Sequence, residues 1–91
     1  MIGWYKKRPI PVRCLQWNGM NLQECKDFCG DALHVDYPTL DDTIVILSLD
    51  TLEGRMNVPM NAYLIQGVEG EFYACKESVF NSTYEWVRND D

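Results

Sequence analysis

The sequence predicts an α+β fold, in which one α-helix packs on a curled, mostly antiparallel sheet of five to six strands. The chain has 91 residues and 46% hydrophobic content, which suits one globular domain spanning residues 1–91. Residues 21–31 have the clearest helical spacing of apolar side chains. Most of the remaining chain consists of short alternating segments between turns, a pattern typical of hairpin-linked strands.

The first predicted strand covers residues 10–17. Its side chains alternate between two faces: Ile10, Val12 and Cys14 on one, and Arg13, Leu15 and Trp17 on the other. Pro9 and Pro11 stand at its beginning, which suits an edge or the opening of a strand because proline has no N–H to donate.

The helix predicted over residues 21–31 has recognisable ends. Asn21 is a candidate N-cap, Glu24 is its capping-box partner, and Gly30 is placed to end the helix in a left-handed conformation. The apolar face consists of Leu22, Cys25, Phe28 and Cys29. This face is expected to lie on the sheet.

The rest of the chain reads as strands and turns. Strands are predicted over residues 32–38, 43–49, 61–66, 71–75 and 83–88, with a turn at Glu53-Gly54 within 49–58 and one helical turn over 76–82. The apolar segment 43–49 is expected to be central, because both of its faces are hydrophobic.

The stretch "IQGVEGEFYACKESVF", residues 65–80, predicts a hairpin with a filled inner face. Gly67 and Gly70 allow a tight loop. In the returning strand, Phe72 and Ala74 point to one face, and Glu71, Tyr73 and Cys75 point to the other. Val79 and Phe80 are then expected to fold back over the sheet.

The charge is distributed unevenly. The net charge is −6, but residues 1–13 contain four basic residues and no acid, so residues 14–91, with four bases and fourteen acids, have a balance of −10. Residues 1–9 form a basic N-terminal arm. A nucleic-acid-binding fold needs a basic stripe across its body, so direct nucleic-acid binding is not expected. No apolar run approaches the roughly 18 residues of a membrane span, and no signal peptide is visible, so we expect neither a membrane partner nor secretion.

The four cysteines, Cys14, Cys25, Cys29 and Cys75, occupy apolar positions of their segments. Without a secretion signal, free thiols packed as small apolar side chains are the favoured interpretation. A structural zinc site, with the Cys25-x3-Cys29 pair as its nucleus, is the alternative. His34 is the only histidine and reads as a strand residue rather than a general base. We predict no metal, no cofactor and no catalytic residue.

The aromatic residues outnumber what so small a core needs to hide. Exposed aromatic rings beside a cation could stack on a planar ligand or anchor a protein partner, while the alternative is that they cover the second face of the sheet. Tyr84 and Trp86 are expected on one face of the last strand. The candidate ligand- or partner-binding residues are Arg13, Trp17, Glu71, Tyr73, Lys76, Tyr84 and Trp86.

Motifs along almost the whole chain resemble a family of small phage and prophage proteins of Gram-positive bacteria. They are "YKKRP" (5–9), "VRCLQW" (12–17), "FCG" (28–30), "TLEGRM" (51–56), "NAYLIQGVEGEFYACKESVF" (61–80) and "TYE" (83–85). Two positions depart from the family pattern: Asn61-Ala62-Tyr63 replaces Gly-Asp-Tyr, and Ala74 replaces the proline before Cys75. The first departure changes a turn.

The resemblance implies a phage origin, the bacterial host cytoplasm and no defined activity. In that context the leading hypothesis is a non-enzymatic, homo-oligomeric binding protein that counteracts a bacterial defence system. Its partner would be a nucleotide-derived small molecule that it sequesters or a host defence protein that it occludes. Two alternatives stay open: an acidic DNA mimic that inhibits a nucleic-acid-binding host protein, and a structural or assembly accessory of the virion.

Overall fold

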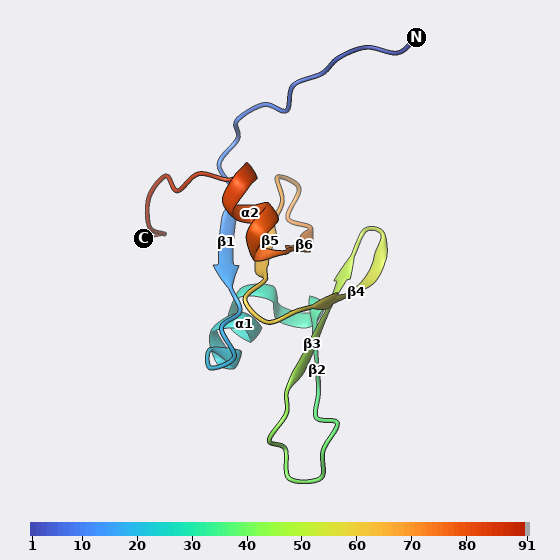
Figure 1. The fold of residues 1–91 in the computed structure, drawn as a ribbon, viewed down its shortest axis with the longest axis vertical. Coiled ribbons are helices and arrows are strands. Elements are labelled where there is room, and N and C mark those ends of the chain that lie inside the picture. Colours follow the sequence, from blue (N-terminus) through green and yellow to red (C-terminus); the bar gives the residue numbers. More distant parts are fainter. Residues whose placement is uncertain (91) are drawn as a thin grey trace.

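A computed structural model describes residues 1–90, and the chain is α+β with two antiparallel three-stranded sheets that do not close into a barrel (Figure 1). The elements are β1 (Arg13–Gln16), α1 (Leu22–Cys29), the 3-10 helix η1 (Gly30–Ala32), β2 (Leu33–Asp36), β3 (Ile46–Thr51), β4 (Gly54–Val58), β5 (Tyr63–Gln66), β6 (Phe72–Cys75) and α2 (Glu77–Thr83). The predicted fold class and antiparallel pairing are confirmed. The single sheet and the single helix are wrong.

The strands divide into the orders β1-β5-β6 and β2-β3-β4. The division follows from the connection between β4 and β5. There Pro59 lacks an N–H, and Asn61 adopts a φ of 68°, so the β4 ladder cannot continue. β5 therefore pairs with β1, with Cys14 opposite Ile65 and Leu15 opposite Leu64.

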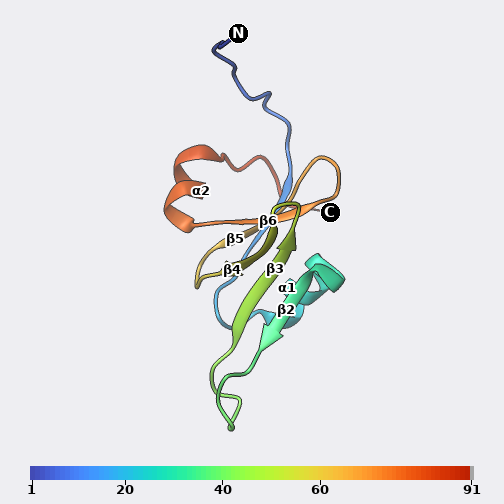
Figure 2. The ribbon, with the colours of Figure 1, turned by 90° about the vertical axis from the view of Figure 1, so that its right-hand side faces the viewer.

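One hydrophobic core joins both sheets and α1, which contacts β2 and β5. The predicted apolar face of α1 is confirmed: Cys25 and Cys29 are buried, and Leu22 and Phe28 pack against them. The buried cluster consists of Trp17, Cys25, Cys29, Leu47, Leu49, Val58, Ala62 and Leu64. Figure 2 shows α1 and α2 on opposite sides of the sheets, so α2 contributes to a separate, outer layer.

The ends of α1 agree only partly with their sequence signals. Gly30 ends the helix with a positive φ of 57°, as predicted, but its ψ of −135° is not that of a left-handed helical cap. The Asn21 side chain caps no helical N–H. Instead its Oδ1 accepts a hydrogen bond from the Asn18 N–H at 3.0 Å, and its Nδ2 donates to Glu24 Oε1 at 3.0 Å. The predicted capping box is therefore wrong, because Asn21 stabilises the preceding turn.

The predicted strand at 83–88 is also wrong. Residues 77–83 form α2, and residues 84–90 belong to no helix or strand. A strand needs a free neighbouring edge, but α2 carries the chain over the face of β1-β5-β6, where Phe80 stacks on Tyr63. The segment therefore begins above the sheet face and not beside a strand edge, and residues 84–90 pair with no strand despite their β-forming residues.

Candidate binding surface

The outer face of β1-β5-β6 is covered by four aromatic side chains, Tyr63, Tyr73, Phe80 and Tyr84, which we call the aromatic cap. The Phe80 ring stacks on the rings of both Tyr63 and Tyr84: its centroid lies 3.6 Å from the Tyr63 centroid and 4.6 Å from the Tyr84 centroid. The hydroxyl groups of Tyr73 and Tyr84 are 3.3 Å apart. The expectation that Phe80 folds back over the sheet is confirmed, whereas Val79 is exposed.

Tyr84 is the polar member that the cap holds most firmly. Burial, followed by the hydrogen bond with Tyr73, raises the pKa of the Tyr84 phenol well above its ordinary value. Tyr84 therefore remains neutral and keeps its hydrogen bond at physiological pH. Its position fixes the start of the segment that follows α2.

That segment, residues 84–90, is held at two points and exposed between them. Its first point is Tyr84, and its second is Asp90, whose Oδ2 accepts a hydrogen bond from Arg13 Nη2 at 3.1 Å. Between them Trp86 and Val87 are exposed, with 76% of Trp86 accessible to solvent. The two contacts restrict the segment at both ends and leave the Trp86 ring in solvent.

Arg13 is the charged centre of this region. Besides Asp90, it donates a hydrogen bond to Gln66 Oε1 at 3.1 Å, and its Cζ lies 5.2 Å from the Phe28 ring centroid. It also lines a hollow of about 280 Å³ beside Gly67 and Val68. We call Arg13, Trp86, Val87 and Asp90 the tail surface.

The structure separates the other predicted binding residues. Trp17 is 3% exposed and belongs to the core, so the expectation that its ring is available to a partner is wrong: it faces the buried cluster rather than solvent. Glu71 accepts a hydrogen bond from the Glu69 N–H at 3.1 Å and so closes the 67–70 turn. Lys76 lines a second hollow of about 220 Å³ with Met56, Pro59 and Ala74.

The sequence predicted Arg13, Tyr73, Tyr84 and Trp86 as candidate binding residues but not their arrangement. It missed Asp90, whose partner is 77 residues away in the chain. No local signal identifies such a pair. It also assigned Tyr84 and Trp86 to one strand face, whereas Tyr84 is part of the cap and Trp86 lies beyond it.

The four cysteines are free thiols, and no group of three or more potential metal-ligating side chains occurs among residues 1–90. Burial, followed by the charge of Glu24, raises the pKa of Cys25 to about 11, and burial, followed by Cys25, raises that of Cys29 to about 12. Burial and Cys75 also raise the pKa of Cys14. Thiols with raised pKa values are poor nucleophiles at neutral pH, because the thiolate is the reactive form.

These thiols predict a loss of stability in alkali. The unfolded chain releases their protons near the ordinary pKa of 9.0, whereas the folded chain retains them to about 11 and about 12. Above pH 9 the unfolded state therefore binds fewer protons, and the free energy of unfolding falls by at most about 1.4 kcal/mol per pH unit for each thiol. Urea unfolding at a series of pH values measures the slope. Cys29→Ala is expected to flatten it, and an unchanged slope in that variant would contradict the assignment.

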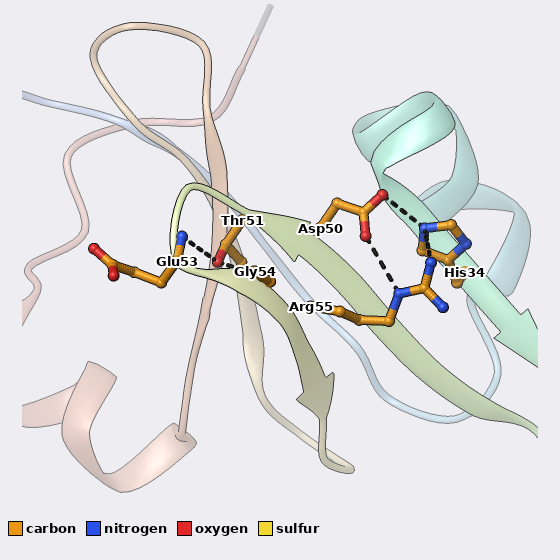
Figure 3. A network of polar contacts seen from close by, with 6 residues as sticks. All are labelled: His34, Asp50, Thr51, Glu53, Gly54 and Arg55. Atoms are coloured by element: carbon orange, nitrogen blue, oxygen red, sulfur yellow. Dashed lines mark hydrogen bonds and ion pairs between the residues drawn. The ribbon is translucent and has the colours of Figure 1, made fainter.

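His34 belongs to a polar cluster on the other sheet (Figure 3). Its Nε2 lies 2.7 Å from Asp50 Oδ2 and 3.0 Å from Arg55 Nη2, and Arg55 Nε donates to Asp50 Oδ1 at 3.3 Å. The His34 hydrogen bond is the main cause that lowers the pKa of Asp50. Asp50 is paired directly with Arg55 across β3 and β4, so the cluster serves as a cross-strand contact.

The adjoining β3–β4 turn confirms its sequence signal. Gly54 has a φ of 106°, and Thr51 Oγ1 donates to the Gly54 carbonyl at 2.7 Å while accepting from the Glu53 N–H at 3.1 Å (Figure 3). The cluster and turn leave no nucleophile hydrogen-bonded to His34 among the described residues. The contacts of this cluster link β2, β3 and β4 through His34, Asp50 and Arg55.

Comparison of the chain with protein-family models, with curated proteins and with solved structures gave no match. Among residues 1–90, no helix has the length and apolar content needed to cross a lipid bilayer. The tail surface therefore has to be interpreted from its own contacts.

Proposed function

We propose that this chain is a non-enzymatic binding protein, encoded by a phage, that counteracts a bacterial defence system by occluding a host protein. The tail surface carries the proposal, because Trp86 is exposed on a segment held by Tyr84 and by the Arg13–Asp90 ion pair. Tryptophan and arginine dominate the binding energy of protein interfaces. The phage and defence context comes from the resemblance of the motifs.

The exposed area supports a role in binding. The accessible surface is 7364 Å², whereas a compact monomer of 10.6 kDa exposes roughly 5,500 Å². The radius of gyration is 14.7 Å, compared with about 12 Å for a compact chain of this length. The excess is larger than the roughly 800 Å² that each partner buries in a standard interface.

The shape of the surface favours a protein partner over a sequestered small molecule. The hollows beside Arg13 and Lys76 measure about 280 and 220 Å³, below the roughly 300–1,000 Å³ of small-molecule pockets. An exposed ring and its neighbouring aliphatic side chain instead form a convex anchor that fits a hollow on a partner.

Replacing Trp86 by alanine is expected to abolish the activity without unfolding the protein. Loss of a tryptophan anchor costs about 2 kcal/mol or more of binding energy, which is about a 30-fold loss of affinity. The test plates phages on bacterial strains that each carry one defence system, with and without the protein. We expect the wild type to restore plaques on at least one strain and Trp86→Ala to fail there.

Met20→Ala is the matched control, because Met20 is also exposed but lies outside the tail surface. Restoration of plaques by Trp86→Ala would contradict the tail surface as the site. Failure of the wild type on every strain would contradict the anti-defence role, and recovery of the protein in purified phage particles would favour the virion alternative. Salt-sensitive capture of a basic DNA-binding host protein would favour DNA mimicry.

A further inference from the structure

The N-terminal arm, residues 1–9, is the most exposed part of the molecule. Ile2, Trp4 and Tyr5 have at least 94% of their surface accessible. Among the described residues, the only backbone hydrogen bond of this region joins the Ile10 N–H to the Arg8 carbonyl at 2.9 Å. Large apolar side chains grouped in this way mark an interaction site, since a folded monomer normally hides them. The arm is therefore a binding segment without a partner inside its own molecule.

Proline keeps the arm extended and separate from its own sheet. Pro9 and Pro11 flank Ile10, and neither has an N–H to give to a strand ladder. Consequently β1 begins only at Arg13, although the alternating pattern starts at residue 10. Because proline fixes its own φ and restricts the residue before it, the Arg8-Pro9 end of the arm stays extended. This lowers the entropy that the arm loses when it binds along another strand.

The β2–β3 hairpin offers a surface of complementary character. β2 is an edge strand, so one side of its backbone has no ladder partner. Beyond it, the loop exposes Tyr37, Leu40 and Ile44. Residues 36–46, which we call the hairpin end, contain three acids and no basic residue, whereas the arm contains three basic residues and no acid. The apolar side chains of the hairpin end can pack against those of the arm, and its negative charges can pair with the positive charges of the arm.

The two surfaces lie at opposite ends of the molecule. Figure 1 shows the arm and the hairpin end pointing in opposite directions along the longest axis, whose extent is 53 Å. In this structure neither surface reaches the other. Both surfaces gain a binding partner if the arm of one copy contacts the hairpin end of a second copy.

We propose that the arm of one copy docks along the β2 edge and hairpin end of a second copy. Its backbone extends β2-β3-β4 by one strand, Trp4 and Tyr5 cover Leu40 and Tyr37, and the basic residues lie beside the acids. Because the arm and the hairpin end are different surfaces, the contact is heterologous. Each added copy leaves one arm and one hairpin end free, so the association closes as a ring or continues as a filament.

Two variants and their mixture test this docking by analytical ultracentrifugation. The arm variant is Lys6→Glu/Lys7→Glu, and the hairpin variant is Tyr37→Ser/Leu40→Ser; all four side chains are exposed, so both proteins should fold. We expect the wild type to grow in mass with concentration and to dissociate at high salt. Each variant alone should be monomeric, whereas an equimolar mixture should form one heterodimer, because only one intact arm and one intact hairpin end remain.

Leu52→Ser is the matched control, because Leu52 is exposed in the β3–β4 turn, and it should associate like the wild type. A monomeric wild type would overturn the proposal and would indicate either a free arm or an arm folded on its own molecule. Association of the arm variant alone, or a mixture that stays monomeric, would also overturn it. Trp86→Ala should leave the assembly unchanged, which keeps this result separate from the proposed function.

Discussion

Replacing Trp17 by alanine is expected to destabilise the protein by about 3–5 kcal/mol. Trp17 is 3% exposed and packs in the cluster that joins α1 to both sheets. The free energy of unfolding of a chain of this length is about 5–14 kcal/mol, so the variant would lose a large share of its stability. Urea unfolding followed by far-ultraviolet circular dichroism measures the change without relying on tryptophan fluorescence.

Two variants provide the controls for Trp17. Trp17→Phe keeps an aromatic ring in the cavity and should lose less stability than Trp17→Ala. Trp86→Ala removes the same side chain from an exposed site and should change the free energy of unfolding by less than about 0.5 kcal/mol. Equal effects of Trp17→Ala and Trp86→Ala would show that Trp17 does not support the core.

The contrast between the two tryptophans shows what alternation can predict. The predicted alternation is confirmed for the residues within β1 and β6, because side chains in a strand alternate whatever lies around it. Ile10, Val12, Trp17 and Glu71 lie outside these strands. Alternation does not say which face meets α1. Trp17 lies just beyond β1, and its backbone N–H donates to the Ala62 carbonyl at 2.9 Å. This contact depends on the path of the chain 45 residues later.

The division into two sheets depended on a local feature that strand patterns do not contain. Asn61 has positive φ at the position where the resembling family has a turn residue, so the departure noted in the sequence does lie at a turn. The strand pattern predicted a strand from residue 61, whereas residues 60 and 61 form a turn, after which β5 leaves β4 and pairs with β1. Pairing partners are set by long-range packing, so the residues of each strand predict its existence better than its neighbours.

The tail surface was partly visible in the sequence for a similar reason. The abundance of aromatic residues near cations led to the prediction of Arg13 and Trp86, and of Tyr84 at the start of the same segment, as candidate binding residues. Their arrangement required α2 to turn the chain over the sheet, and the signal for α2 was a single helical turn at 76–82. The prediction of a strand at 83–88 put Tyr84 and Trp86 on one strand face. In the structure Tyr84 contacts Phe80 and Tyr73, whereas Trp86 is exposed to solvent.

Replacing Phe80 by alanine is expected to release residues 84–90 and to weaken partner binding as strongly as Trp86→Ala. The Phe80 ring lies against both Tyr63 and Tyr84, and aromatic pairs each contribute about 0.5–1.5 kcal/mol beyond the area that they bury. Without Phe80, Tyr84 loses its stacking partner, and only its hydroxyl contact with Tyr73 and the exposed Arg13–Asp90 pair hold the segment. Heteronuclear NOE values for residues 84–88 should fall, reporting faster motion of the backbone.

Phe80→Leu and Tyr73→Phe separate the causes of this release. Leucine keeps apolar volume over Tyr63 and should preserve most of the stability but only part of the order at Trp86. Tyr73→Phe removes the hydroxyl contact with Tyr84 while leaving the rings in place, so it should lower the Tyr84 pKa, since the Tyr73 hydrogen bond is the second cause of its rise, with little effect on the segment. If Phe80→Ala left the motion of residues 84–88 unchanged, stacking would not position Trp86. The segment would then have to be fixed by the Tyr73–Tyr84 hydroxyl contact and the ion pair, a contact worth about 1 kcal/mol or less at an exposed site.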